Sequence, residues 1–174
     1  RQHFHTPGWI TKSALGGDNR EVSHPMLTKK GKYGIKALVH LAQLPAGQLA
    51  FVGEVASTNN IPKKFLDTIL AELRNAGFVQ SRKGKDGGYR LARPAEDIMV
   101  GHVVRVLDGP LAPISCASRT RYEPCDDCDE ATCQVRHMML EVRQAIADVL
   151  DNRSLAEMRD IPDEASIVPR KQSA

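Results

Sequence analysis

The sequence predicts a mainly α-helical fold with one small β-hairpin, and three observations carry this prediction. Apolar residues recur at helical spacing in several segments, two short strand-like runs flank a glycine-rich basic loop, and a long segment near residue 140 carries apolar residues alternately four and three positions apart. Of the 174 residues 41% are hydrophobic but only 5% aromatic, so the core must be built from aliphatic side chains. We expect either one domain or one compact domain with an appended element.

Three helices are expected before the hairpin. The first spans about 29–44, where Thr28 can cap its start, and the second spans about 53–58. The third spans about 62–75, because the missing N–H of Pro62 costs nothing at a first helical position. Its buried stripe is expected to contain Leu66, Ile69, Leu70 and Leu73.

The next segment predicts a β-hairpin followed by a fourth helix. Strands at about 78–82 and 89–92 flank the loop Lys-Gly-Lys-Asp-Gly-Gly at 83–88, and the helix spans about 100–107. Two short helices joined by a tight turn and followed by a basic hairpin are the pattern of a winged helix-turn-helix. This pattern indicates that the chain binds duplex DNA.

The charge distribution agrees with a polyanion partner. Residues 28–93 hold 12 basic and 4 acidic residues, a net charge of +8, whereas residues 94–160 hold 7 basic and 13 acidic residues, a net charge of −6. The start of the third helix can enter a major groove, and the hairpin can lie along phosphates. The candidate DNA-binding residues are Thr28, Lys29, Pro62, Lys63, Lys64, Asp67, Arg82, Lys83, Lys85, Gly87, Gly88, Tyr89 and Arg90.

Four cysteines lie close together in a segment without periodicity, with eight, two and four residues between them. They are Cys116, Cys125, Cys128 and Cys133. Soft thiolates select zinc or iron–sulfur clusters, and a Cys-x2-Cys pair can also work as a regulatory dithiol, so all three interpretations stay open. His137 is one helical turn beyond Cys133 and is an alternative ligand.

A long helix is predicted from about residue 133 to 150. Its apolar residues have the spacing of a helix that packs along another helix. They are Val135, Met139, Val142, Ile146 and Val149.

These elements give an expected domain organisation. We expect a disordered extension at 1–25, the winged helix-turn-helix at 26–110, the cysteine-rich loop at 111–132, the dimerisation helix with a short following helix at 133–158, and a disordered tail at 159–174. The sequence contains neither a run of membrane-span length nor a stretch that resembles a signal peptide, so a cytoplasmic protein is expected.

From Met26 to about Met158 the chain resembles the IscR-, NsrR- and RirA-like regulators, the Rrf2 family. Residues 27–38 are close to the first helix of that family, 84–91 match its wing signature, and 103–110 and 133–136 match the elements around its cluster loop. The resemblance implies a homodimer with a long crossing helix, an operator with two half-sites, and a 2Fe-2S or 4Fe-4S cluster whose state changes DNA affinity.

The chain departs from that family at the cysteines. The family usually has three, and a histidine three residues after the last one completes the site in the biogenesis regulator. Arg136 stands at that place here, and Tyr33 stands near the position of an aspartate ligand in the nitric-oxide-sensing branch. An all-cysteine site is therefore expected, although some family members bind no cluster.

Taken together, the sequence predicts a homodimeric transcription regulator, in the repressor class, that senses iron, iron–sulfur status, nitric oxide or redox stress. The alternative is a thiol- or zinc-based regulator without a cluster. A dithiol redox enzyme is disfavoured, because Cys125 and Cys128 lie among acidic residues that do not lower a thiol pKa. A module that only binds another protein is a further alternative. We expect neither enzymatic activity, nor a small-molecule substrate, nor a membrane partner.

Overall fold

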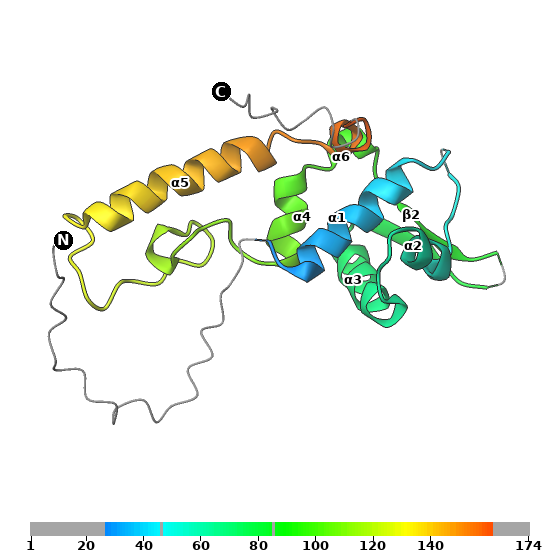
Figure 1. The fold of residues 1–174 in the computed structure, drawn as a ribbon, viewed down its shortest axis with the longest axis horizontal. Helices are drawn as coiled ribbons and strands as arrows, with labels where there is room; N and C mark the ends of the chain where they lie inside the picture. Colours follow the sequence, from blue (N-terminus) through cyan, green and yellow to red (C-terminus); the bar gives the residue numbers. More distant parts are fainter. Residues whose placement is uncertain (1–26, 46, 85, 162–174) are drawn as a thin grey trace, which may run out of the picture.

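The computed structural model of the chain describes residues 27–45, 47–84 and 86–161 (Figure 1). Their elements, in chain order, are α1 (Lys29–Ala42), α2 (Val52–Thr58), α3 (Lys63–Asn75), β1 (Val79–Arg82), β2 (Gly88–Leu91), the 3-10 turn η1 (Ala95–Asp97), α4 (Val100–Leu107), the 3-10 turn η2 (Ser115–Ala117), α5 (Gln134–Leu150) and α6 (Leu155–Arg159). The predicted fold class is therefore confirmed. The extension expected at 1–25 and nearly all of the tail expected at 159–174 lie outside the described residues.

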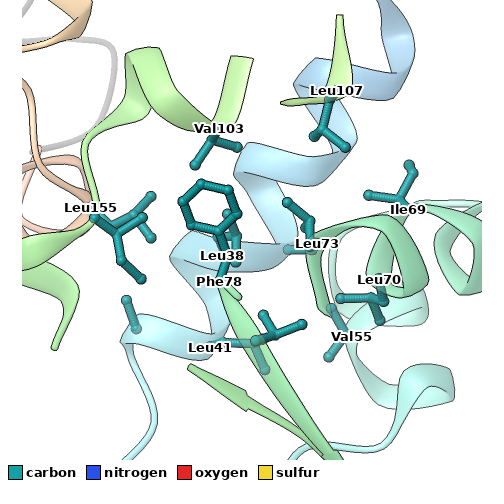
Figure 2. Packing of buried hydrophobic residues seen from close by; sticks show 14 of the residues in the cluster. Leu38, Leu41, Val55, Ile69, Leu70, Leu73, Phe78, Val103, Leu107 and Leu155 are labelled. Atoms are coloured by element: carbon teal, nitrogen blue, oxygen red, sulfur yellow. The ribbon is translucent and has the colours of Figure 1, made fainter. Parts of the chain in front are cut away.

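The core forms around α3, which contacts α1, α2, α4 and β1. All four residues of its predicted stripe are buried: Leu66, Ile69, Leu70 and Leu73. Figure 2 shows Leu38 of α1 and Val103 of α4 beside this stripe. The spacing of aliphatic residues along three separate helices thus produces one shared core.

The short α6 completes this core although it comes after the long helix in the sequence. Leu155 is fully buried, and α6 packs against α1 and η1. Its position is fixed by backbone hydrogen bonds from the Val100 N–H to the Arg153 carbonyl at 2.8 Å and from the Leu155 N–H to the Ile98 carbonyl at 2.9 Å. The chain therefore leaves the helical core after α4 and returns to it at α6.

Several helix ends differ by one or two residues from the sequence expectation, and two of the helix starts have a clear cause. The third helix begins at Lys63 and not at Pro62, whose backbone is not helical and whose carbonyl accepts hydrogen bonds from the amides of Phe65 and Leu66. The long helix begins at Gln134, because Cys133 is its N-cap and accepts a hydrogen bond from an amide of the first turn. Capping geometry, which periodicity does not show, decides both ends.

The wing is the antiparallel pair β1–β2, in which Val79 lies opposite Leu91. β2 also pairs on its other side with Ala50, through hydrogen bonds of 3.0 and 2.9 Å between the backbones of Ala50 and Tyr89. Gly88 is required here, because its φ of +148° lies outside the usual range of L-residues and a Cβ would lie 2.5 Å from the Ala50 carbonyl oxygen. The wing is therefore anchored to the segment that leads into α2.

Residues 111–150, which contain η2 and α5, form an extension that we call the cysteine arm. Figure 1 shows α5 running away from the helical core. The arm is joined to α4 by Arg105 and Asp151, the residue after α5, whose carboxylate accepts hydrogen bonds from both terminal guanidinium nitrogens at 2.5 and 2.8 Å. Among the described residues, no helix is long and apolar enough to cross a membrane.

This ion pair gives a prediction about stability. Hydrogen bonding to Arg105 lowers the pKa of Asp151 below its ordinary value. A carboxyl group with a lowered folded-state pKa contributes stability above its unfolded-state pKa and loses it as the pH falls through the folded-state value. The Asp151→Asn variant should therefore lower the free energy of unfolding by about 1 kcal/mol at pH 7, and the deficit should shrink below about pH 4.

Urea unfolding of both proteins over a series of pH values measures this difference. The matched control is Asp148→Asn on α5, where the carboxylate accepts a hydrogen bond from Gln144. Equal stability of the Asp151 and Asp148 variants at pH 7 would show that the ion pair does not hold the arm.

Candidate DNA-binding groove and cysteine cavity

The start of α3 and the wing line one groove of about 450 Å³. Lys63 and Asp67 come from α3, and Arg82 and Lys83 come from the end of β1 and the loop after it. All four of these residues are exposed. The structure thus brings charged side chains that are about 20 positions apart in the sequence to the two sides of one channel.

The other predicted DNA-binding residues are placed differently. Gly87, Gly88 and Tyr89 line the same groove, whereas Lys64 is exposed beside it and Lys85 lies outside the described residues.

Three further candidates do not line this groove. Arg90 lines a different hollow and donates a hydrogen bond to Gln80, because consecutive residues of a strand point to opposite faces. Pro62 and Lys29 are exposed at the starts of their helices.

Thr28 is engaged within the protein. Its hydroxyl accepts hydrogen bonds from the amides of Lys30 and Gly31 and donates one to the Asp108 carboxylate. It therefore caps α1 and ties that helix to the end of α4.

The groove also contains residues that the sequence did not single out. Phe51 lies at its edge with 52% of its surface exposed, and Arg74 and Ser81 line it. An aromatic residue directly before a predicted helix, such as Phe51, is a weak sequence signal of a binding surface. Arg74 lies at the far end of α3 and lines the groove only because the wing folds back over that end. No local sequence pattern predicts this.

All four cysteines line a second cavity, of about 600 Å³, in the cysteine arm. Cys116 is buried in η2, whereas Cys125, Cys128 and Cys133 are half-buried. The ligand atoms of Cys125, Asp127 and Cys128 all lie within 4.8 Å of one another. The loop, the 3-10 turn and the start of α5 therefore all contribute cysteines to the lining of one cavity.

The thiols differ in acidity. Hydrogen bonds to the thiols of Cys125 and Cys133 raise the pKa of Cys128 to about 12, and a hydrogen bond to the Asp127 carboxylate raises the pKa of Cys125. The backbone N–H of Arg136, followed by the Cys128 thiol, lowers the pKa of Cys133. The sulfur at the N-terminus of α5 is therefore the first of these three to become a thiolate.

The donor set fits a soft metal centre. Four sulfur ligands in one cavity suit zinc or an iron–sulfur cluster, both of which bind thiolates. One cationic side chain lies at the cavity, since Arg136 is the one basic residue among the described residues that line it. His137, the alternative ligand considered from the sequence, is exposed on α5 and is not among the lining residues.

Comparisons with known proteins agree with this arrangement. The Rrf2 family model, described as an iron-dependent transcriptional regulator, matches residues 27–160. A Rhodobacter capsulatus protein described as an Rrf2-like HTH-type transcriptional regulator is 42% identical over 137 residues, which cover 76% of this chain and 91% of that protein.

Two solved structures are similar along most of their length. CymR (YrzC), the global cysteine regulator of B. subtilis, superposes with a TM-score of 0.66 at 31% identity and covers 79% of this chain and 98% of its own. T. potens IscR superposes with a TM-score of 0.63 at 30% identity, over 82% of this chain and 92% of its own. The helical core, the wing and the cysteine arm described above thus belong to a member of the Rrf2 family of transcriptional regulators.

Proposed function

We propose that this chain is a homodimeric, sequence-specific regulator that binds operator DNA through the groove between α3 and the wing. We further propose that it senses iron, iron–sulfur status, nitric oxide or redox stress through its cysteine cavity. The observation that carries the sensing role is the convergence of four cysteines, spread over residues 116–133, on one cavity. The same chain places a basic groove on a separate part of the fold.

The groove supports DNA binding through its geometry and charge. The start of α3 presents Lys63 and Asp67, which can reach base edges in a major groove, whereas Arg82 and Lys83 on the wing can contact phosphates. The pairing of β2 with Ala50 holds the wing at a fixed distance from α2. Lys64, Lys85 and the wing glycines remain part of the proposed interface.

The exposed face of α5 supports a dimer. Within the described part of the chain, none of the 17 residues of this helix is fully buried, and Ile146 of the stripe is partly buried against the chain's own core. Val135 is 58% exposed, Val142 40% and Val149 62%, and all three belong to the stripe that the sequence predicts. An apolar stripe of this length on a soluble protein needs cover, and a second copy of α5 has the complementary spacing.

The sensing site is proposed as an iron–sulfur cluster, of the 2Fe-2S or 4Fe-4S type, held by Cys116, Cys125, Cys128 and Cys133. Such a cluster, when bound, supplies a centre that changes its oxidation state or is lost on reaction with oxidants or nitric oxide. The residues of the chain hold the sulfur atoms in place, bring Cys133 toward its thiolate form and restrict solvent around Cys116.

The alternative is a thiol- or zinc-based sensor without a cluster. It is favoured by the ligand atoms of Cys125, Asp127 and Cys128, which all lie within 4.8 Å of one another. Thiolate and carboxylate groups at this spacing can ligate one zinc ion, and two neighbouring thiols can be oxidised to a disulfide by an external oxidant. The presence of a visible absorption band in protein purified without oxygen distinguishes the cluster from both alternatives.

The sensing role predicts that operator affinity depends on the state of the cavity. The probe is an operator selected from random-sequence DNA. Its affinity for protein that contains the cluster should differ by about 10-fold or more from its affinity for protein depleted of the cluster. A difference of this size is typical of a coupling free energy of about 1–3 kcal/mol. Anaerobic fluorescence titration measures both affinities, and a Cys116→Ser variant serves as a permanently cluster-free control. Equal affinities would remove the switch and leave the DNA binding.

The DNA-binding groove predicts a distinct effect of salt. The Arg82→Ala variant should bind selected and unselected DNA more weakly and should reduce the slope of log affinity against log salt by about 1, because one phosphate contact is lost. The matched control, Arg159→Ala, removes an arginine of α6 that pairs with Asp160 and should change neither quantity. An unchanged salt slope in Arg82→Ala would exclude the wing from the interface.

The dimer predicts that a charge in the apolar stripe separates the subunits. Val142→Glu should sediment as a monomer at concentrations where the wild-type chain is a dimer, because its carboxylate would be desolvated at the helix contact. Operator affinity should fall about 100-fold with the loss of bivalent binding. The neighbouring exposed Glu141→Gln is the control, and a dimeric Val142→Glu protein would show that the stripe serves another purpose.

A further inference from the structure

Arg136 links the segments that carry the cysteines. It lies in the first turn of α5, where its backbone N–H donates to the Cys133 sulfur at 3.4 Å. Its side chain reaches across to η2, where Nε donates to the backbone carbonyl of Cys116 at 3.1 Å. One residue thus connects two cysteines that are 17 positions apart.

Glu130 extends this link to a third cysteine. One of its carboxylate oxygens lies 3.6 Å from Nε of Arg136, and the other accepts a hydrogen bond from the backbone N–H of Cys125 at 3.2 Å. The Tyr122 hydroxyl donates to the same carboxylate. The side chains of Arg136 and Glu130 are only 22% and 25% exposed, so water competes less for this ion pair than for a fully exposed one.

The charge of Arg136 also matters for the cavity. Glu123, Asp126 and Asp127 line it beside the four cysteines, and Arg136 is the one basic residue among the described lining residues. Thiols bind metals as thiolates, so a loaded site concentrates negative charge, which a neighbouring cation favours. A fixed guanidinium supplies that cation without occupying a ligand position, since arginine stays protonated.

We propose that Arg136 and Glu130 form a positioning pair. The pair holds the backbone at Cys116, Cys125 and Cys133 in the arrangement that binds a soft metal. Arg136 also offsets the negative charge of the ligands. The proposal rests on the proposed metal-binding role of the cavity. It assigns to Arg136 a role as support for the ligands and not as a ligand. The pair acts in the metal-free chain, where it keeps the cavity assembled before any metal arrives.

The experiment is an anaerobic titration of the reduced, metal-free full chain with Co²⁺, followed by the sulfur-to-cobalt charge-transfer absorption. Arg136→Gln should bind Co²⁺ about 10- to 100-fold more weakly than wild type, the usual effect of losing a residue that orients metal ligands. Arg136→Lys should give an intermediate affinity, because it keeps the charge but loses the planar geometry of the guanidinium. Arg121→Gln, which removes an exposed arginine of the same loop, should bind like wild type.

A double-mutant cycle tests whether the two residues act together. The Glu130→Gln and Arg136→Gln effects should be clearly less than additive in the double variant, because either change breaks the same contact. Thermal unfolding of the metal-free variants checks that the helical core is intact, since neither side chain contributes to it.

The outcomes separate the two proposals. A wild-type chain that takes up neither Co²⁺ nor a cluster would overturn the metal-binding role and the positioning pair with it. If the wild-type chain binds Co²⁺ and the Arg136→Gln variant binds it as tightly as the Arg121→Gln control, the positioning pair alone would be overturned. Additive effects of Glu130 and Arg136 would show that they do not work as a unit, and equal losses in Arg136→Gln and Arg136→Lys would remove the role of the charge.

Discussion

The contact between Arg105 and Asp151 is the constraint that ties the cysteine arm to the helical core. It is a bidentate ion pair between α4, which is packed into the helical core, and Asp151, which directly follows α5. Near this end of α5, Ile146 and Leu150 are partly buried against the same core. Gly101 leaves room for it, because a Cβ at that position would collide with the Asp151 carboxylate. The direction of α5 is therefore set at the point where the arm joins the core, and a helix of 17 residues carries that direction over about 25 Å.

Because α5 is a continuous helix, its two ends are mechanically connected. Cys133 caps its first turn in the cysteine cavity, and the chain beyond its last turn leads directly into α6, which is buried in the core. In the proposed function, a rearrangement of the cysteines acts on the helical core through α5 and α6.

The two sites have opposite electrostatic characters for a physical reason. In the proposed function the groove binds phosphates, and its lysines and arginines are exposed, where solvation keeps them charged at little cost. The cavity holds sulfur atoms among carboxylates, so Arg136 compensates there for several negative groups. The basic half of the sequence thus contains the groove, and the acidic half contains the cysteine cavity.

The sequence by itself determined what depends on short-range patterns: the helices and hairpin, the buried stripe of α3, the basic character of the wing and the crowding of cysteines in one loop. Periodicity and residue preference act over a few positions, so they can be read directly. Tertiary structure alone decided that α6 joins the core. It also placed Phe51 and Arg74 in the groove and turned Arg90 away from it. The close approach of Gly88 to Ala50 likewise depends on how the wing packs. Tertiary structure also decided that Arg136 and Glu130 join the cysteine segments. These features depend on contacts between residues that are far apart in the chain, and such contacts are fixed only when the whole core packs.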